Sequence, residues 1–463
     1  MILNYFENKT IKNHALPVEW RSQESLDELL EFLQYNWEQR AIFYDDGKVN
    51  SKQQFLDFLG QKSIKTKDYV GTIAFKGHQL NIFPKVFKEF KDDDDRDGLD
   101  LRHLMHNLVK WIEYTAKIDY PYISISADLE NTDNLQELFI SLYVRYVKAA
   151  LDRGLYFRYE EKTEDLSTIR GKLDIKDYIA RKYPNGQLDK FQCSYSTFEF
   201  DNLLNRIIKC TLKVVWRIAT PRNQKIIRSL LNKLGDVTDQ NCTPRDCDTI
   251  QLSRMQSKYR IILSMSKMFL LNKTTDYNLD TQDSFCFMFP TDLLFEGFIG
   301  GYLKHLLQGE AKVTLQASEV SLIDSIRLGD QELGQAFVMR HDILIEHKEK
   351  GVFLLDTKYK EISRFEGNPD LKADLINDIT IADLYQVHTY AASRGLDKVF
   401  LLYPQFRFEE KEPCSAIMET PVEVAGQKSK INIYAVRLPF VFEDDDEKTE
   451  LLLKESLRSL LKV

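Results

Sequence analysis

Apolar and polar positions form their clearest pattern between residues 337 and 360, where the chain reads FVMRHDILIEHKEKGVFLLDTKYK. The pattern predicts a strand over Phe337–His347, a tight turn at Lys348–Gly351 and a second strand over Val352–Tyr359. The glycine that closes the turn supplies the backbone freedom that a hairpin needs. The continuous apolar run Val352–Leu355 is typical of a strand that is buried on both faces. We therefore predict a hairpin whose second strand lies inside the protein.

Helical periodicity dominates the middle of the chain, and β patterns flank it. Residues 1–100 combine an amphipathic helix with a β-hairpin, which predicts an α+β region. Residues 101–275 are mostly helical, apart from a non-helical excursion at 163–200 with strand and turn patterns. Residues 276–463 follow the order α-β-β-β-α-β, which predicts an α/β domain with a mixed sheet. The predicted helices are Ser25–Tyr35, Leu101–Tyr114, Leu135–Leu151, Asn202–Ile218 with Asp201 as its N-cap, Asn223–Leu234, Leu252–Leu271, Thr291–Leu307, Ile379–Arg394 and Lys448–Leu461, and the other predicted strands lie in Tyr69–Val86, Lys312–Leu315, Lys398–Tyr403 and Ile431–Leu438.

Length and composition indicate a folded protein with more than one domain. A chain of 463 residues is too long for a single core, and 43% of its residues are hydrophobic, as in soluble proteins. No apolar run is long enough to cross a membrane, and the N-terminus lacks the apolar core of a signal peptide. The six cysteines are scattered, which favours free thiols in a reducing compartment. We therefore expect a cytoplasmic protein that does not contact the membrane.

The charge balance limits how the protein can meet nucleic acid. The formal net charge is −8, which argues against a chain that coats nucleic acid by bulk electrostatics. If the protein acts on DNA, it needs a local basic surface or a partner that holds the DNA. No G-x-x-x-x-G-K-[ST] motif occurs, so we do not expect nucleotide hydrolysis by a P-loop mechanism. We expect the acidic run Asp92–Asp95 to be a solvated loop at a boundary.

Polar residues gather at the end of the predicted buried strand. Because side chains alternate along a strand, Asp356 and Lys358 point the same way, and Asp342 on the partner strand can reach the same place. Two carboxylates and a lysine in apolar surroundings are costly unless they pair with each other or with a metal. Two carboxylates suit Mg²⁺, with Mn²⁺ as a substitute. The lysine would orient or deprotonate an attacking water, or stabilise charge on a phosphate; the alternative is a surface hairpin with an ordinary salt bridge.

The spacing of these residues resembles the PD-(D/E)xK nuclease superfamily. Asp342 is followed, after a short gap, by Asp356-Thr357-Lys358, while His341 stands where that superfamily usually has proline. The resemblance implies that Asp342 and Asp356 bind Mg²⁺. The backbone carbonyl of Thr357 would complete the metal site, and Lys358 would assist the attacking water.

Two helices add candidate residues to this site. Gln386 and Tyr390 are four residues apart and share a face of the helix that ends before Gly395. They resemble the Q-x-x-x-Y helix of these nucleases, in which the glutamine approaches the site; the alternative is a polar pair on a helix surface. Glu296 lies in the helix before the hairpin, where some of these nucleases carry a further metal ligand. Its alternative is a carboxylate that faces solvent.

Short motifs along most of the chain extend the resemblance. None is specific alone, but their order and spacing resemble the McrC subunit of McrBC-type modification-dependent restriction systems. The motifs are LNIFPK at Leu80–Lys85, IRG at Ile169–Gly171, Phe198 with Asp201 and Asn205–Lys209, LFE at Leu294–Glu296, Asp342 with Asp356–Lys360, and DLYQ at Asp383–Gln386.

The resemblance implies a nuclease that works with a partner. In that family McrC cleaves DNA and joins a hexameric AAA+ GTPase, McrB, whose chain recognises methylated cytosine and translocates DNA. It implies methylated double-stranded DNA as the substrate and an N-terminal half that contacts the ring and stimulates its GTPase. Two other interpretations stay open: a free-standing nuclease in repair, and a non-catalytic regulator of an AAA+ ring.

The predicted ring contact is the excursion at 163–200. A segment that activates a ring must project from its domain, and here Arg170 stands beside the flexible Gly171. A basic residue at this place would reorganise a subunit interface, as a trans-acting arginine does in phosphoryl transfer. The alternative is a surface ion pair between Arg170 and Glu164 or Asp165.

Overall fold

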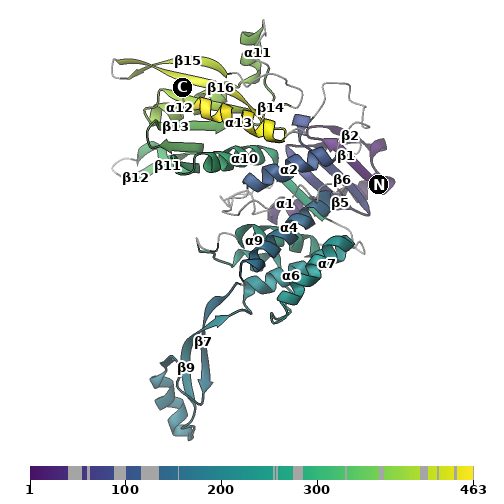
Figure 1. Ribbon diagram of the computed structural model, residues 1–463, viewed down its shortest axis with the longest axis vertical. Coiled ribbons are helices and arrows are strands. Elements are labelled where there is room, and N and C mark those ends of the chain that lie inside the picture. Colours follow the sequence, from purple (N-terminus) through teal and green to yellow (C-terminus); the bar gives the residue numbers. More distant parts are fainter. Residues whose placement is uncertain are drawn as a thin grey trace.

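The structure is a computed structural model, which describes most of the chain. The described residues are 1–39, 55–59, 63–87, 101–115, 135–154, 156–253, 256, 259–274, 285–328, 331–363, 370–406, 415–424, 427–442 and 446–461. The predicted acidic loop Asp92–Asp95 lies outside them. Within these ranges, no helix is both long enough and apolar enough to cross a membrane. Figure 1 shows two sheets at one end, a helical part below them and a slender projection at the other end.

The N-terminal part is built on a four-stranded sheet in the order β1-β6-β5-β10. Its two faces pack against different helices, because residues of alternating direction enter two separate hydrophobic clusters. Helix α1 covers one face with Leu29 and Phe32, and α4 covers the other with Phe139. The elements are β1 (Ile2–Phe6), β2 (Thr10–Lys12), α1 (Gln23–Gln39), β3 (Leu56–Phe58), β4 (Ser63–Thr66), β5 (Tyr69–Phe75), β6 (His78–Phe83) and β10 (Phe285–Pro290), of which β2, β4 and β3 form a small second sheet.

Strand β10 corrects the predicted domain division. It pairs antiparallel with β5, so Phe285–Pro290 belongs to the N-terminal sheet and not to a C-terminal domain that begins at residue 276. Its sequence, FCFMFP, is apolar throughout because both faces are buried: Phe287 packs against α4, and Met288 lies in the cluster of α1. The pairing joins residues that are far apart in sequence, and no local pattern predicts it.

The helical part confirms the predicted helices with small shifts at most ends, but α9 begins at Tyr259 rather than at the predicted Leu252, and the short α8 was not predicted. One hydrophobic cluster runs from these helices into one face of the C-terminal sheet, so the two regions share a core. The helices are α2 (Leu101–Thr115), α4 (Leu135–Asp152), α6 (Leu203–Ile218), α7 (Pro221–Lys233), α8 (Pro244–Asp248) and α9 (Tyr259–Thr274).

The predicted excursion is an arm, which we define as residues 158–199. Two long antiparallel strands carry it away from the helices, and Figure 1 shows it projecting from the body. The prediction of a non-helical segment is wrong at the tip, where short helical turns sit between the strands. The elements of the arm are β7 (Arg158–Leu166), β8 (Lys172–Leu173), α5 (Ile175–Asp177), η5 (Tyr178–Lys182), η6 (Tyr183–Asn185) and β9 (Phe191–Glu199).

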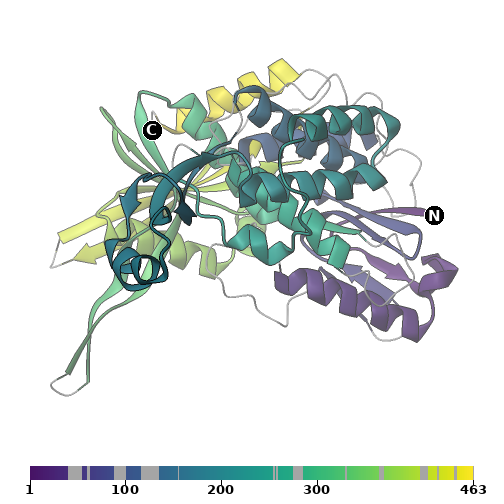
Figure 2. The same cartoon turned by 90° about the horizontal axis from the view of Figure 1, so that it is seen from below.

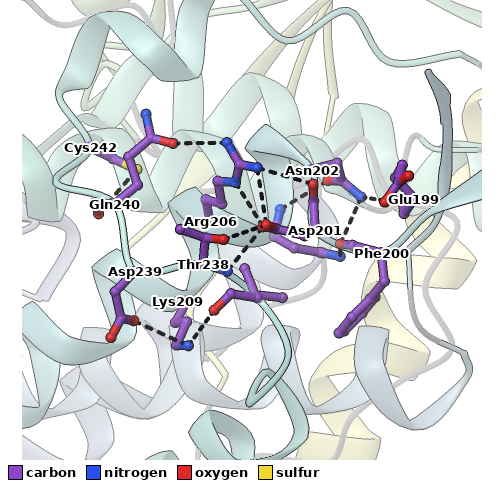
Figure 3. Close-up of polar contacts among 12 residues, drawn as sticks. Glu199, Phe200, Asp201, Asn202, Arg206, Lys209, Thr238, Asp239, Gln240 and Cys242 are labelled. Atoms are coloured by element: carbon purple, nitrogen blue, oxygen red, sulfur yellow. Dashed lines mark hydrogen bonds and ion pairs between the residues drawn. The ribbon is translucent and has the colours of Figure 1, made fainter. Parts of the chain in front are cut away.

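Buried polar contacts hold the base of the arm (Figure 3). Asn202 caps α6, accepting a hydrogen bond from the Asn205 amide at 3.2 Å, so the prediction of Asp201 as N-cap is wrong. The Asn202 side chain also donates to the carbonyls of Tyr156 and Phe200, at 3.2 and 3.1 Å, which flank the two arm strands. Asp201 instead bonds Arg206 at 2.7 Å. The arm is therefore attached to α6 at both of its strands.

The C-terminal part is a six-stranded mixed sheet in the order β11-β12-β13-β14-β16-β15. Its strands are β11 (Ala311–Leu328), β12 (Gln331–His347), β13 (Gly351–Thr357), β14 (Lys398–Gln405), β15 (Ser415–Val424) and β16 (Gln427–Pro439), and its helices are α10 (Thr291–Leu306), α11 (Leu371–Asp378), α12 (Ile381–Ser393) and α13 (Asp446–Leu460). The predicted central hairpin and the strands around it are confirmed, whereas β15 was not predicted. The β11–β12 hairpin is longer than predicted, and Figure 2 shows it extending away from the body.

The two faces of this sheet pack against different helices. Along β13, Phe353 and Leu355 enter the cluster that contains α10, while Leu354 enters the cluster that contains Val387 and Ala391 of α12. Asp356 follows in the alternation and therefore points to the α12 face.

We expect Asn202→Ala to loosen the arm and destabilise the protein. The change removes an N-cap and the bonds from the Asn202 side chain to the Tyr156 and Phe200 carbonyls, to which the Asn205 side chain still donates. The free energy of unfolding should therefore fall by about 2 kcal/mol. Chemical denaturation followed by circular dichroism measures this loss. The matched control is Asn185→Ala at the exposed tip of the arm, where the side chain bonds only the Arg181 carbonyl, at 2.7 Å. Equal stability of the two variants would contradict the role of Asn202.

Candidate active site

Two carboxylates meet where the ladder between β12 and β13 ends. Ile343 pairs with Leu355, and the next step of this register places Asp342 opposite Asp356. The Asp342 carboxylate accepts hydrogen bonds from the Thr357 amide at 2.8 Å and from the Thr357 hydroxyl at 2.9 Å. Asp356 is completely buried. The predicted convergence of the two aspartates is thus present in the structure.

Lys358 and Gln386 complete the group that the sequence predicted. The Lys358 ammonium lies 2.7 Å from Asp356 Oδ2 and donates to Gln386 Oε1 at 3.1 Å. Gln386 lies on α12, and its amide nitrogen donates to the Tyr390 hydroxyl at 3.0 Å. The side chain of Gln386 therefore reaches the site and is oriented from both ends. The chemical roles of these residues stay predictions.

Burial sets the electrostatics of the site. Desolvation, reinforced by the charge of Asp342, raises the pKa of Asp356 to about 7. Desolvation also raises the pKa of Asp342, against the hydrogen bonds from Thr357 and the charge of Lys358. For Lys358, desolvation lowers the pKa, but the carboxylates led by Asp356 outweigh it and the net shift is upward. Lys358 is therefore a cation at neutral pH, beside carboxyl groups that resist ionisation.

The donor set can hold a divalent cation. In the described part of the chain, Asp356 Oδ1 is buried and has no hydrogen-bond partner, which is unusual for a buried polar atom. A hard cation would satisfy this oxygen, and Mg²⁺ needs only one or two carboxylates because water fills its other positions. No three His, Cys, Asp or Glu side chains form a metal cluster within the described ranges. The fit therefore rests on the pair Asp342 and Asp356, with the Thr357 carbonyl nearby.

Glu296 lies beside this pair without forming a three-carboxylate cluster with it. It projects from α10, is partly buried and accepts a hydrogen bond from Gln316 rather than facing solvent. Gln316 lies across from Asp342 on β11 and has a positive φ of 53°, which is uncommon outside glycine. Desolvation and the charge of Asp342 raise the pKa of Glu296 to about 8. Metal ligation by Glu296 stays a prediction.

Asp383 begins the DLYQ motif, but the sequence analysis did not place it at the site. It bonds Lys360 at 2.6 Å and lies 3.9 Å from the Lys358 ammonium. Burial opposes its charge, but hydrogen bonds from Lys360 and Thr380 lower its pKa. Asp383 also closes a capping box with Thr380 at the start of α12. The T-x-x-D spacing was the available signal, and it predicts only the cap.

His341 packs against Tyr390, the residue that bonds Gln386 at the site. Its ring stacks on Tyr390 with a centroid distance of 4.5 Å, and Arg394 Nε lies 3.1 Å from His341 Nε2. Burial and the charge of Arg394 lower the pKa of His341 to about 4, so its ring is neutral at physiological pH. His341 thus packs against the tyrosine that bonds Gln386.

We expect Glu296→Gln to change how stability depends on pH. The pKa of Glu296 rises from 4.5 to about 8 on folding, so the folded protein binds the proton more tightly between these values. The free energy of unfolding of the wild type should fall as pH rises through this window, while glutamine does not titrate. Melting temperatures in chelator-containing buffer should therefore favour the variant increasingly, by a few degrees, at the alkaline end. An unchanged difference between the two proteins would contradict the shift; the exposed Glu349→Gln serves as control.

Comparison with known proteins identifies the family. The family described as "McrBC 5-methylcytosine restriction system component" matches residues 64–404. No curated protein matches the chain. Among solved structures, a half-complex of Thermococcus gammatolerans McrB AAA+ hexamers with bound McrC matches with a TM-score of 0.58 and 19% identity, over 99% of this chain and 100% of that chain. The Thermococcus gammatolerans McrBC complex from cryo-EM matches with a TM-score of 0.46 and 21% identity, over 66% of this chain and 88% of that chain. The family match covers well over half of the sequence, and the chain therefore belongs to the McrBC 5-methylcytosine restriction system component family.

Proposed function

We propose that this chain is the nuclease subunit of a modification-dependent restriction complex and cleaves DNA by Mg²⁺-dependent hydrolysis of phosphodiester bonds. The observation that carries the proposal is the buried Asp356, which faces Asp342, pairs with Lys358 through Oδ2 and leaves Oδ1 with neither a hydrogen bond nor an ion pair. A buried carboxylate oxygen that has no partner and lies next to a second carboxylate is well suited to bind a cation. The family membership supports the same chemistry.

Each site residue has a role in this proposal. Asp342, Asp356 and the Thr357 carbonyl would hold Mg²⁺, which supplies Lewis acidity to the phosphate when bound. Lys358 keeps its proton because its pKa is raised, so it stabilises negative charge and orients water rather than removing a proton. Gln386 accepts a hydrogen bond from Lys358 and fixes the direction of its ammonium.

We expect Asp356→Ala to reduce DNA cleavage to the background level. The change deletes a metal ligand and removes a carboxyl group whose burial is unfavourable, so the fold should persist. A plasmid cleavage assay with Mg²⁺ and the partner ring measures activity, and thermal unfolding measures the fold. The matched control is Asp397→Ala, at an exposed aspartate after α12. Cleavage at the wild-type rate by the Asp356 variant would refute the assignment.

We also propose that the chain binds a hexameric AAA+ ring similar to McrB through its arm. The solved structure of similar fold is of McrC bound to McrB hexamers. The arm tip exposes large apolar side chains that a solvated arm does not need, among them Ile175, Ile179 and Tyr183, each more than half exposed. A protein partner would cover these side chains. Recognition of methylated cytosine and DNA translocation would then reside in the partner chain, in accord with the acidic charge here.

Arg170 has a different environment from the predicted ion pair. Its guanidinium lies over the Tyr195 ring at 4.4 Å from the centroid, and the Tyr195 hydroxyl donates to Glu164 at 3.0 Å. Asp165 pairs instead with Lys182. Arg170 is exposed on the half-buried ring of Tyr195, so its cation stays available to a partner, which supports a contact between Arg170 and the AAA+ ring.

We expect Arg170→Ala, in the full-length protein, to lower the stimulation of nucleotide hydrolysis by the cognate ring. Loss of a cation at the interface should reduce the stimulated rate, while the basal rate of the ring stays unchanged. A phosphate-release assay with the ring and each variant measures the effect. Asp356→Ala is the control and should stimulate like the wild type, because the nuclease site lies away from the arm (Figure 1). No stimulation by the wild type would defeat the partner proposal, and equal stimulation by Arg170→Ala would defeat only the role of Arg170.

A further inference from the structure

A buried carboxylate joins three segments that lie far apart in the sequence. Glu7 directly follows β1 and is only 2% exposed. One of its oxygens accepts a hydrogen bond from the Thr291 hydroxyl. The other accepts from the Lys85 amide at 2.9 Å and from the Tyr359 hydroxyl at 3.1 Å. Glu7, at the end of the N-terminal strand, therefore bonds the residue that directly follows the D-x-K motif.

Two of the three donors belong to segments that carry candidate site residues. Tyr359 directly follows Lys358, and Thr291 is the first residue of the helix that carries Glu296. Lys85 ends the LNIFPK motif, which has no part in the site geometry described so far. Glu7 thus explains why these separate motifs meet.

Further contacts close this junction. The Lys85 ammonium lies over the Tyr359 ring at 4.7 Å from its centroid and pairs with Asp68 at 3.3 Å. The Asp68 carbonyl in turn accepts a hydrogen bond from the Thr291 amide at 3.2 Å. The hydroxyl and the ring of Tyr359 are therefore both held by contacts, and the start of α10 is bonded to the same group of residues. These contacts restrict the movement of Tyr359.

Stability alone does not explain the contacts around Glu7, because burying a carboxyl group is unfavourable. Burial raises the pKa of Glu7 to about 7, although the bonds from Thr291 and Lys85 oppose the shift. A buried carboxyl group contributes less to stability than an apolar group of the same shape, but it sets a precise geometry through three donors.

We propose that Glu7 is a positioning residue for DNA cleavage: through its bond to Tyr359 it fixes the backbone next to Lys358, so that the catalytic lysine depends on the N-terminal sheet. The inference rests on the proposed nuclease function. The Lys358 amide already bonds the Leu402 carbonyl at 2.8 Å on one side, and the Glu7–Tyr359 bond restrains the chain on the other side. Loss of this bond would let the ammonium drift from Asp356 without removing a ligand.

The test compares Tyr359→Phe and Glu7→Leu in the full-length protein with its partner ring and Mg²⁺. Leucine has no acceptor for the Tyr359 hydroxyl, whereas glutamine would keep one. Each change should lower kcat for DNA cleavage by about 10- to 100-fold, as removal of outer-shell partners typically does, and should leave KM for DNA unchanged. Because both changes break the same bond, the double variant should lose no more than the worse single variant.

Tyr143→Phe is the matched control. It also removes a buried tyrosine hydrogen bond, to Ser266 at 2.9 Å, but in the helical part. Its melting temperature should fall about as much as that of Tyr359→Phe, while its kcat should equal that of the wild type. A purely structural role for Tyr359 would give equal kcat for both tyrosine variants, and independent effects would multiply in the double variant; either result overturns the inference. A wild type that cleaves no DNA would instead overturn the proposed function, and this inference with it.

Discussion

The burial of Asp356 is the constraint on which the site depends. A carboxylate at the end of an apolar strand loses its hydration, and only nearby charges and donors can compensate for it. Lys358 supplies the charge, and Gln386 and Tyr390 hold Lys358 in place. One oxygen of Asp356 still lacks a partner, and a hard cation bound there would satisfy it.

The C-terminal sheet is not an independent unit of this fold. Strand β10 returns to the N-terminal sheet before α10 begins, and α2 packs on α10 so closely that a Cβ at Gly301 would lie 2.1 Å from the Tyr114 carbonyl. Trp111 of α2 stacks on Phe440 at 3.9 Å and donates to its carbonyl at 2.8 Å. Together with the bonds of Glu7, these contacts make the geometry of the site depend on the N-terminal sheet and α2 as well as on the C-terminal sheet.

The arm differs from the C-terminal sheet in how it is attached to the rest of the protein. It contributes little to the shared core and is attached through a small set of polar contacts at its base, with Asn202 at their centre (Figure 3). Its long ladder makes it stiff, while its tip exposes apolar residues.

The sequence by itself determined the features that follow from local periodicity. The alternation along residues 337–360 predicted the hairpin and the shared direction of Asp356 and Lys358, and helical spacing predicted that Gln386 and Tyr390 share a face. Tertiary structure decided what depends on contacts between distant segments: the sheet to which β10 belongs, the choice of Asn202 over Asp201 as a cap, and the place of Glu7. Glu7 is a single acidic residue in a polar stretch, and nothing local distinguishes it from a solvated one. Its partners are 78 to 352 positions away, so only the folded chain brings them together.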